Sequence, residues 1–156
     1  MTITTNNKKQ QYANILWLGL LTGTLDAIAA MIWSGKINPT GLFKFIASGS
    51  FGKAAFTGGT DMIIWGLFFH YLIAYSFTAV FYIMYPYFMA GLKNKYFTAI
   101  IYALITWLIT NLLIVPLSCI GWHPIHVRGI IIGFGILIFT IGLPIVLTAN
   151  KLYANH

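Results

Sequence analysis

The sequence has 156 residues, of which 59% are hydrophobic and only 7% are charged. Soluble domains carry about 25% charged residues, so this composition excludes an ordinary soluble domain and predicts a multi-pass membrane protein built as one domain, residues 1–156. The formal net charge of +7 comes from basic residues scattered singly between apolar runs, which fits contact with membrane lipids and argues against nucleic-acid binding.

Four apolar runs are long enough to cross a bilayer, which takes about 20 residues of helix. The predicted fold class is therefore all-α, a polytopic membrane protein with four transmembrane helices. We expect the spans at residues 12–33, 62–85, 97–115 and 129–149.

The ends of these spans carry helix signals. Thr60 or Asp61 is expected to cap the first free N–H groups of the second span. Pro86 and Pro116 are expected to end the second and third spans, because proline has no N–H to donate to the preceding turn. Pro144 lies inside the fourth span and predicts a kink there.

The first connection is the longest loop. Asn38-Pro39 is typical of a helix start, with proline at the first helical position. Residues 41–56 are apolar but too short and too glycine-rich to span. We interpret them as short helices lying in the membrane interface, with Lys44 and Lys53 reaching the headgroups. The alternative is a re-entrant lid over a pore.

Four spans place both termini on one side of the membrane. That side carries five basic residues and the other side four. The basic segment before the first span and the short basic loop between the second and third spans are the strongest indicators of orientation. We therefore expect a multi-pass protein of the cell inner membrane with cytoplasmic termini. The basic residues are Lys8, Lys9, Lys93, Lys95 and Lys151 on the first side and Lys36, Lys44, Lys53 and Arg128 on the second.

Small residues four apart mark two spans. Gly19 and Gly23 lie in the first span, and Gly129 and Gly133 lie in the fourth. This spacing lets helices approach closely, either within the bundle or between two copies in a homo-oligomer.

The strongly polar side chains gather in one half of the predicted membrane. At a rise of 1.5 Å per residue, Asp26 lies about 10 Å, His70 about 13 Å and Asn111 about 8 Å from the end of its helix. These three helix ends all face the first and third loops. The candidate ligand-binding residues are Asp26, His70, Asn111, His123, His126 and Arg128.

Three interpretations of this cluster remain open. In the first, His70 hydrogen-bonds Asp26 and the pair only holds the bundle together, as in a structural or accessory membrane protein. In the second, a water-filled cavity open toward the first and third loops binds a small solute, an ion or protons. In the third, His123 and His126 offer two imidazoles to a metal or haem, although Pro124 between them breaks helical register.

Catalysis has little support in the sequence. No nucleophile stands beside an evident base and oxyanion donor, and no glycine-rich phosphate-binding motif with lysine occurs. A lipid-modifying enzyme would need a groove at headgroup depth lined by His123 or Arg128. We therefore expect no enzyme activity, no metal and no cofactor.

Several short motifs, in this order, resemble a family of small four-helix bacterial inner-membrane proteins. The resemblance implies an integral four-helix protein and transfers no catalytic residue. Members of that family often have a second histidine shortly before the Gly-Leu-Pro of span four, where this sequence has Leu137, and this departure argues against haem ligation. The motifs are Gly23 to Ala27, Phe56 to Gly59, Gly66 to His70, Asn111 to Ser118 and Ile141 to Ile145.

Overall fold

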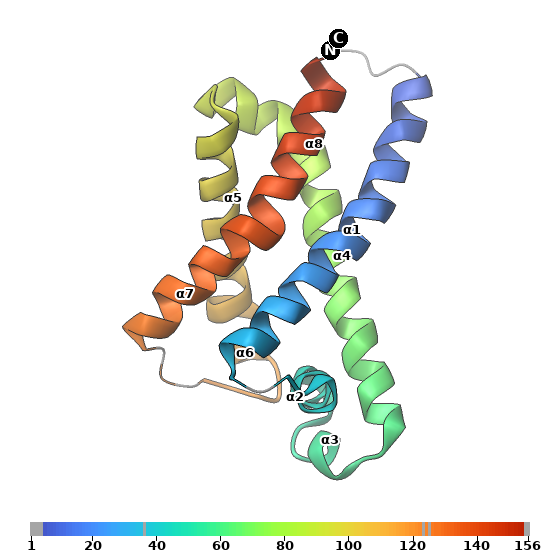
Figure 1. Cartoon of the computed structure of the whole chain (residues 1–156), viewed down its shortest axis with the longest axis vertical. Helices are drawn as coiled ribbons and strands as arrows, with labels where there is room; N and C mark the ends of the chain where they lie inside the picture. The colour runs from blue at the N-terminus through green and yellow to red at the C-terminus, as the bar shows by residue number, and fades with distance from the viewer. Residues whose placement is uncertain (1–4, 36, 123, 125, 155–156) are drawn as a thin grey trace.

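The computed structural model describes residues 5–35, 37–122, 124 and 126–154. The described chain is 88% helical and has no strands (Figure 1). Its elements are α1 (Thr5–Trp33), α2 (Pro39–Phe51), α3 (Ala54–Thr57), α4 (Thr60–Leu92), α5 (Lys95–Leu108), the π-helical segment η1 (Ile109–Ile114), α6 (Val115–Leu117), α7 (Val127–Leu137), the π-helical segment η2 (Ile138–Gly142) and α8 (Leu143–Ala154).

Four helical runs in the described chain are long and apolar enough to cross a membrane. Each contains one of the predicted spans and extends a few residues beyond it, so the all-α, four-helix prediction is confirmed at this level. The runs are Lys9–Trp33, Thr60–Leu92, Lys95–Leu117 and Val127–Tyr153.

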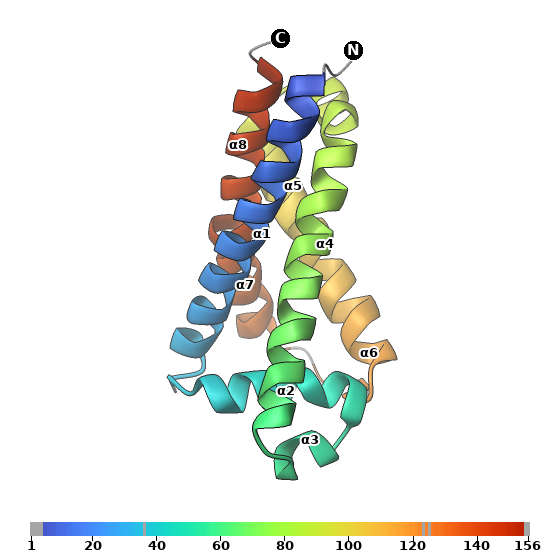
Figure 2. The same ribbon diagram turned by 90° about the vertical axis from the view of Figure 1, so that its right-hand side faces the viewer.

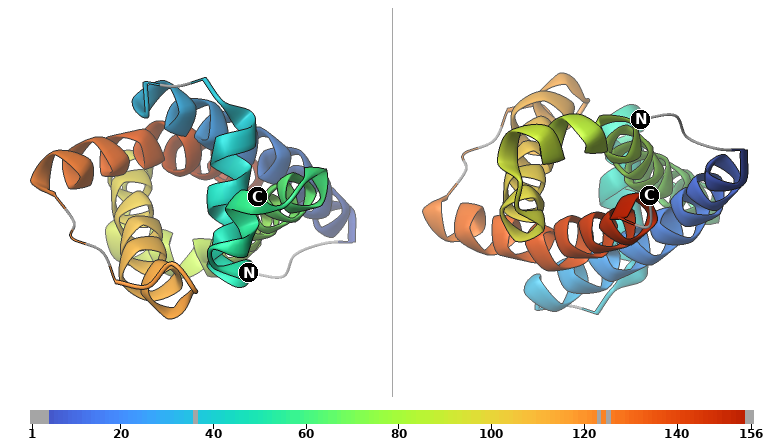
Figure 3. Two further views of the ribbon diagram at one scale, coloured as in Figure 1. Left: turned by 90° about the horizontal axis from the view of Figure 1, so that it is seen from below. Right: turned by 90° about the horizontal axis from the view of Figure 1, so that it is seen from above.

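The four runs form a bundle that is packed tightly at one end and spread at the other. The first turns of α1 and the last turns of α8 lie at the same end of the bundle, and the helices diverge toward the opposite end (Figures 1 and 2). α2 lies across this spread end, as the view from below shows (Figure 3). The buried core sits in the tight half and consists of Leu18, Phe81, Tyr82, Tyr85, Ala99, Tyr102, Ile141, Ile145, Val146 and Ala149.

Glycines bring α1 directly against α4. A Cβ at Gly19 would overlap the ring of Tyr75, and one at Gly23 would meet the ring of Tyr71. The small-residue face of α1 is therefore occupied within the chain. In the fourth run, Gly133 faces Trp107 of the third run, and a Cβ at Gly129 would meet nothing within 4 Å because Gly129 lines a cavity.

The first connection folds into the short helices predicted for it. Asn38 caps α2, because its side-chain oxygen accepts a hydrogen bond from the Gly41 N–H at 3.0 Å. Lys44 reaches back to the end of α3, where its ammonium donates to the carbonyl of Gly58 at 2.6 Å. This positive charge stabilises the carbonyl end of the helix, so Lys44 is a structural tether and does not extend outward as expected.

α2 is fixed to the bundle at two points. The backbone of α2 at Phe43 presses against Gly66 of α4 so closely that a Cβ at Gly66 would overlap the Phe43 carbonyl. At its other end, the N–H of Cys119 donates to the carbonyl of Gly49 at 2.8 Å. The first and third loops therefore meet across the spread end of the bundle.

The predictions about the ends of α4 are wrong in two respects. The N-cap is Gly59, which offers no side-chain cap, and Asp61 lies in the first turn, where a carboxylate suits the positive end of the helix dipole. The helix then continues through Pro86 to Leu92. Aromatic rings pack on both sides of the proline: Tyr85 stacks on Tyr153 with ring centroids 4.6 Å apart, and Phe88 stacks on Phe81 at 5.7 Å.

Both π-helical segments directly precede a proline. η1 ends two residues before Pro116, and η2 ends two residues before Pro144. A proline ring clashes with the carbonyl four residues earlier, and a wider helical turn relieves that clash. The distortion predicted at Pro144 is therefore a π turn, and Pro116 does not end its helical run, which continues to Leu117.

A candidate polar cavity

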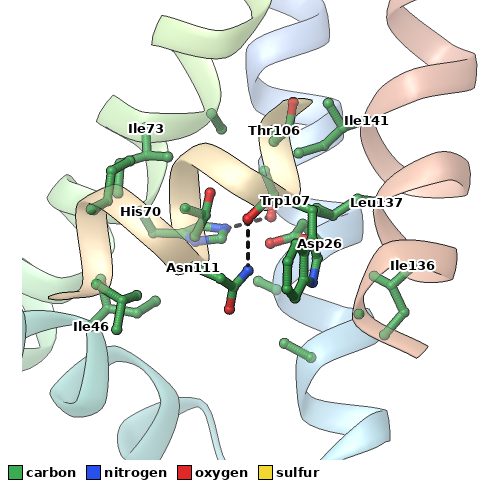
Figure 4. A pocket seen from close by; sticks show the side chains of 18 of the residues that line it. Asp26, Ile46, His70, Ile73, Thr106, Trp107, Asn111, Ile136, Leu137 and Ile141 are labelled. Atoms are coloured by element: carbon green, nitrogen blue, oxygen red, sulfur yellow. Dashed lines mark hydrogen bonds between the residues drawn. The ribbon is translucent and has the colours of Figure 1, made fainter. Parts of the chain in front are cut away.

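A cavity of about 410 Å³ lies in the spread half of the bundle, and we call it the Asp26 cavity. Its volume falls within the range of about 300–1,000 Å³ that small-molecule sites occupy. Residues of α1, α4, α5, η1 and α7 form its walls, and α2 contributes residues on the side of the first and third loops (Figure 4). Its polar lining residues are Asp26, His70, Thr106, Trp107, Thr110, Asn111 and Ser118.

The carboxylate of Asp26 is poorly satisfied. It accepts a hydrogen bond from the Thr140 hydroxyl at 3.4 Å, and that hydroxyl also donates to the Ile136 carbonyl at 3.0 Å. The single hydroxyl hydrogen of Thr140 is shared between two acceptors, so its hydrogen bond to Asp26 is weak. An ionised carboxylate has about four acceptor positions. Asp26 thus keeps most of its hydrogen-bonding capacity for the cavity.

His70 lies on the same cavity but bonds a different group from the one predicted. Its Nε2 lies 2.7 Å from the carbonyl oxygen of Gly23 on α1. Because a carbonyl only accepts, Nε2 carries the hydrogen in this contact and Nδ1 is left as the other ring nitrogen. The hydrogen bond from His70 to Asp26 is not formed, although the two side chains extend into the same space (Figure 4) and interact electrostatically.

Asn111 and Trp107 form the wall contributed by the third span. The Asn111 amide donates to the Trp107 carbonyl at 3.0 Å, across the start of η1. The side-chain N–H of Trp107 lies beside Gly133 of α7 and has no hydrogen-bond acceptor among the described residues. Next to it, the buried hydroxyl of Thr106 has no partner among the described residues either.

Two more of the predicted site residues, His126 and Arg128, lie at a neighbouring cavity. This second cavity, of about 480 Å³, is lined by His126 and Arg128 and shares lining residues with the Asp26 cavity. The Arg128 guanidinium lies 5.2 Å from the centroid of the Trp33 ring, at the boundary between the two. The shared residues are Trp33, Trp107, Asn111 and Gly129.

The six predicted site residues are therefore split. Asp26, His70 and Asn111 line one cavity, whereas His126 and Arg128 lie beside it, and His123 falls outside the described residues. Within the part of the chain that the structure describes, no three His, Cys, Asp or Glu side chains are placed to hold a metal ion.

Reasoning from the sequence missed five polar side chains of the site: Thr106, Trp107, Thr110, Ser118 and Thr140. A signal for Thr140 was present, because it stands shortly before Pro144 much as Asn111 stands shortly before Pro116. A polar residue in an apolar span just ahead of a proline marks both π-helical segments of this cavity.

No protein-family model, curated protein or solved structure matches this chain. The fold and the cavity alone define its class: a four-helix, all-α protein with the properties of a multi-pass membrane protein.

Proposed function

We propose that the protein binds a small solute, an ion or protons in the Asp26 cavity. One observation carries the proposal: the carboxylate of Asp26 lines a cavity of about 410 Å³ and accepts a single hydrogen bond from the described residues, of 3.4 Å. A charged side chain near the middle of a membrane helix costs about 3 kcal/mol. A carboxylate kept only for structure should have its acceptor positions filled by the protein.

The position of His70 supports the same proposal. Its ring reaches the cavity wall from α4 while Asp26 reaches it from α1, so two ionisable side chains face one space. Ionisable side chains inside membrane spans commonly line solute or proton pathways. The proposed role involves binding or transport and no catalysis.

We propose further that the protein sits in the cell inner membrane, in contact with lipids, with both termini in the cytoplasm. The basic residues at the terminal end support this orientation. The Asp26 cavity then lies in the half of the bundle nearer the opposite side, where α2 and the third loop lie.

A structural role for the polar groups is the second candidate. Two hydrogen bonds join α1 to α4 here, one from His70 to Gly23 and one of 2.8 Å between the hydroxyls of Thr24 and Tyr71. Such bonds hold neighbouring helices in register. On this alternative, changes at Asp26 or His70 alter stability alone.

Infrared difference spectroscopy separates the two candidates, because the chain has only two acidic side chains, Asp26 and Asp61. The protein is reconstituted in lipid nanodiscs, and carboxyl bands are followed during pH steps and after addition of ammonium, sodium or acetate ions. Asp26→Asn assigns the Asp26 band, and Asp61→Asn is the matched control.

The proposal expects the Asp26 band to respond to pH or to at least one of these ions. A band that stays constant under every condition, together with a lower melting temperature of Asp26→Asn, would establish the structural role instead.

A further inference from the structure

The charge of the Asp26 cavity narrows the class of solute. None of the described residues that line it is Lys or Arg, and Asp26 is its only acidic side chain. From this charge and from the surfaces around it, we propose that the cavity binds a small organic monocation, an amine or a quaternary ammonium ion. The inference rests on the proposed binding function and specifies its ligand.

The aromatic lining fits such a cation. Trp33 and Trp107 lie on the side shared with the second cavity, and Phe45 of α2 and Phe77 of α4 line the other walls. Aromatic faces attract ammonium groups, and tryptophan is the strongest of them. A carboxylate beside aromatic rings recognises both the charge and the apolar substituents of an organic cation.

The free hydrogen-bonding groups point the same way. The Asp26 carboxylate can accept an N–H of an amine, or lie beside the charge of a quaternary ammonium ion, because Thr140 satisfies it only weakly. The buried Thr106 hydroxyl, which has no partner among the described residues, offers a further acceptor on the same cavity.

Inorganic cations fit the lining less well. Hard ions such as Ca²⁺ and Mg²⁺ take about six or more oxygen ligands. Most of the lining is apolar, and Asp26 is the only carboxylate on it. A cavity of about 410 Å³ lies toward the small end of the range for organic ligands, so we expect a compact cation with few polar groups.

Arg128 lies at the boundary of the cavity, where its positive charge repels cations. Its guanidinium is exposed and lies over the Trp33 ring instead of lining the Asp26 cavity. The local preference for cations should therefore be set inside, by Asp26, and be reduced at the entrance by Arg128.

Charged thiol reagents measure this preference directly. Thr110→Cys in a Cys119→Ser background places a thiol on the cavity wall, and Ala30→Cys provides a second position if the first variant does not fold. The rates of reaction with the cationic reagent MTSET and the anionic reagent MTSES are compared in nanodiscs. The same ratio at the exposed native Cys119 is the reference, which corrects for the reagents themselves.

We expect the MTSET-to-MTSES ratio at the cavity thiol to exceed that at Cys119 at least tenfold. Adding Asp26→Asn should bring the ratio back to the reference. Phenyltrimethylammonium should slow labelling of the cavity thiol at least threefold, whereas benzoate and benzyl alcohol at the same concentration should leave it unchanged.

Two results would overturn the inference in different ways. If both reagents react but the ratio equals the reference, or if benzyl alcohol protects as well as the cation, the cavity admits solutes without selecting cations, and only the ligand class is wrong. If Cys119 reacts but neither reagent labels either cavity thiol, and the Asp26 infrared band is constant, then the proposed binding function is wrong as well as the ligand class.

Discussion

Replacing Gly66 by alanine tests whether α2 is held tightly against α4. Gly66 is buried, and an added Cβ would overlap the carbonyl of Phe43, which belongs to backbone and cannot rotate away. Overpacking of this kind costs about 1–3 kcal/mol, and the better helix propensity of alanine returns about 0.5–1 kcal/mol. We expect Gly66→Ala to lower the free energy of unfolding by about 1 kcal/mol, the difference between these two terms.

The assay is an unfolding titration with SDS in mixed micelles, followed by far-UV circular dichroism. Gly91→Ala is the matched control, because it lies on the same helix and an added Cβ there meets nothing within 4 Å. The control should be neutral or slightly stabilised. Equal stability of the two variants would refute the close contact between α2 and α4.

The same substitution has a consequence for the cavity. Leu42, Phe45 and Ile46 of α2 line the Asp26 cavity, and displacement of α2 moves all three. Labelling of the Thr110→Cys thiol by MTSET should therefore become faster in Gly66→Ala and remain unchanged in Gly91→Ala.

Three further substitutions probe single hydrogen bonds around the site. Thr140→Val removes the bond to Asp26 and should shift the Asp26 carboxyl band in infrared spectra, with a stability loss below about 1 kcal/mol because that bond is long. Tyr71→Phe removes the bond between α1 and α4 at Thr24 and should lower the free energy of unfolding by about 1 kcal/mol in SDS titrations. Lys44→Met removes the charge-assisted bond to the end of α3 and should cost about 1.5–3 kcal/mol, seen as a lower melting temperature.

Each of these changes has a control in the same chain. Thr148→Val leaves Asp26 untouched, since the Thr148 hydroxyl donates to the Pro144 carbonyl. Tyr87→Phe alters an exposed tyrosine, and Lys53→Met removes an exposed lysine that makes no bond to the end of α3. Controls that behave like their test variants would show that the assigned bonds do not matter.

The helices, and the distance of each polar group from the end of its helix, could be predicted because both depend only on the local sequence. The length of an apolar run fixes a span, and the rise per residue fixes how far Asp26 and His70 lie from its end. The rotation of the helices could not be obtained in this way. It depends on where Tyr75 fits over Gly19 between α1 and α4, a contact between residues far apart in sequence.

The errors have physical causes of the same kind. The helix-breaking preference of Pro86 is outweighed by aromatic packing of Tyr85, which no local rule contains. Thr140 was overlooked because a threonine in an apolar span usually bonds its own helix, as this one also does. The apolar pattern of α2 favours a helix in the membrane interface over a lid, and its close contact with Gly66, which places it across one end of the bundle, could not be obtained from that pattern.

The contact between α2 and α4 also couples two parts of the site mechanically. Gly66 lies one helical turn before His70, so the backbone that supports α2 is the backbone that carries the imidazole. The same stretch of α4 thus holds α2 at Gly66 and α1 at His70, so a displacement of α2 would change the packing of the turn that positions the histidine ring.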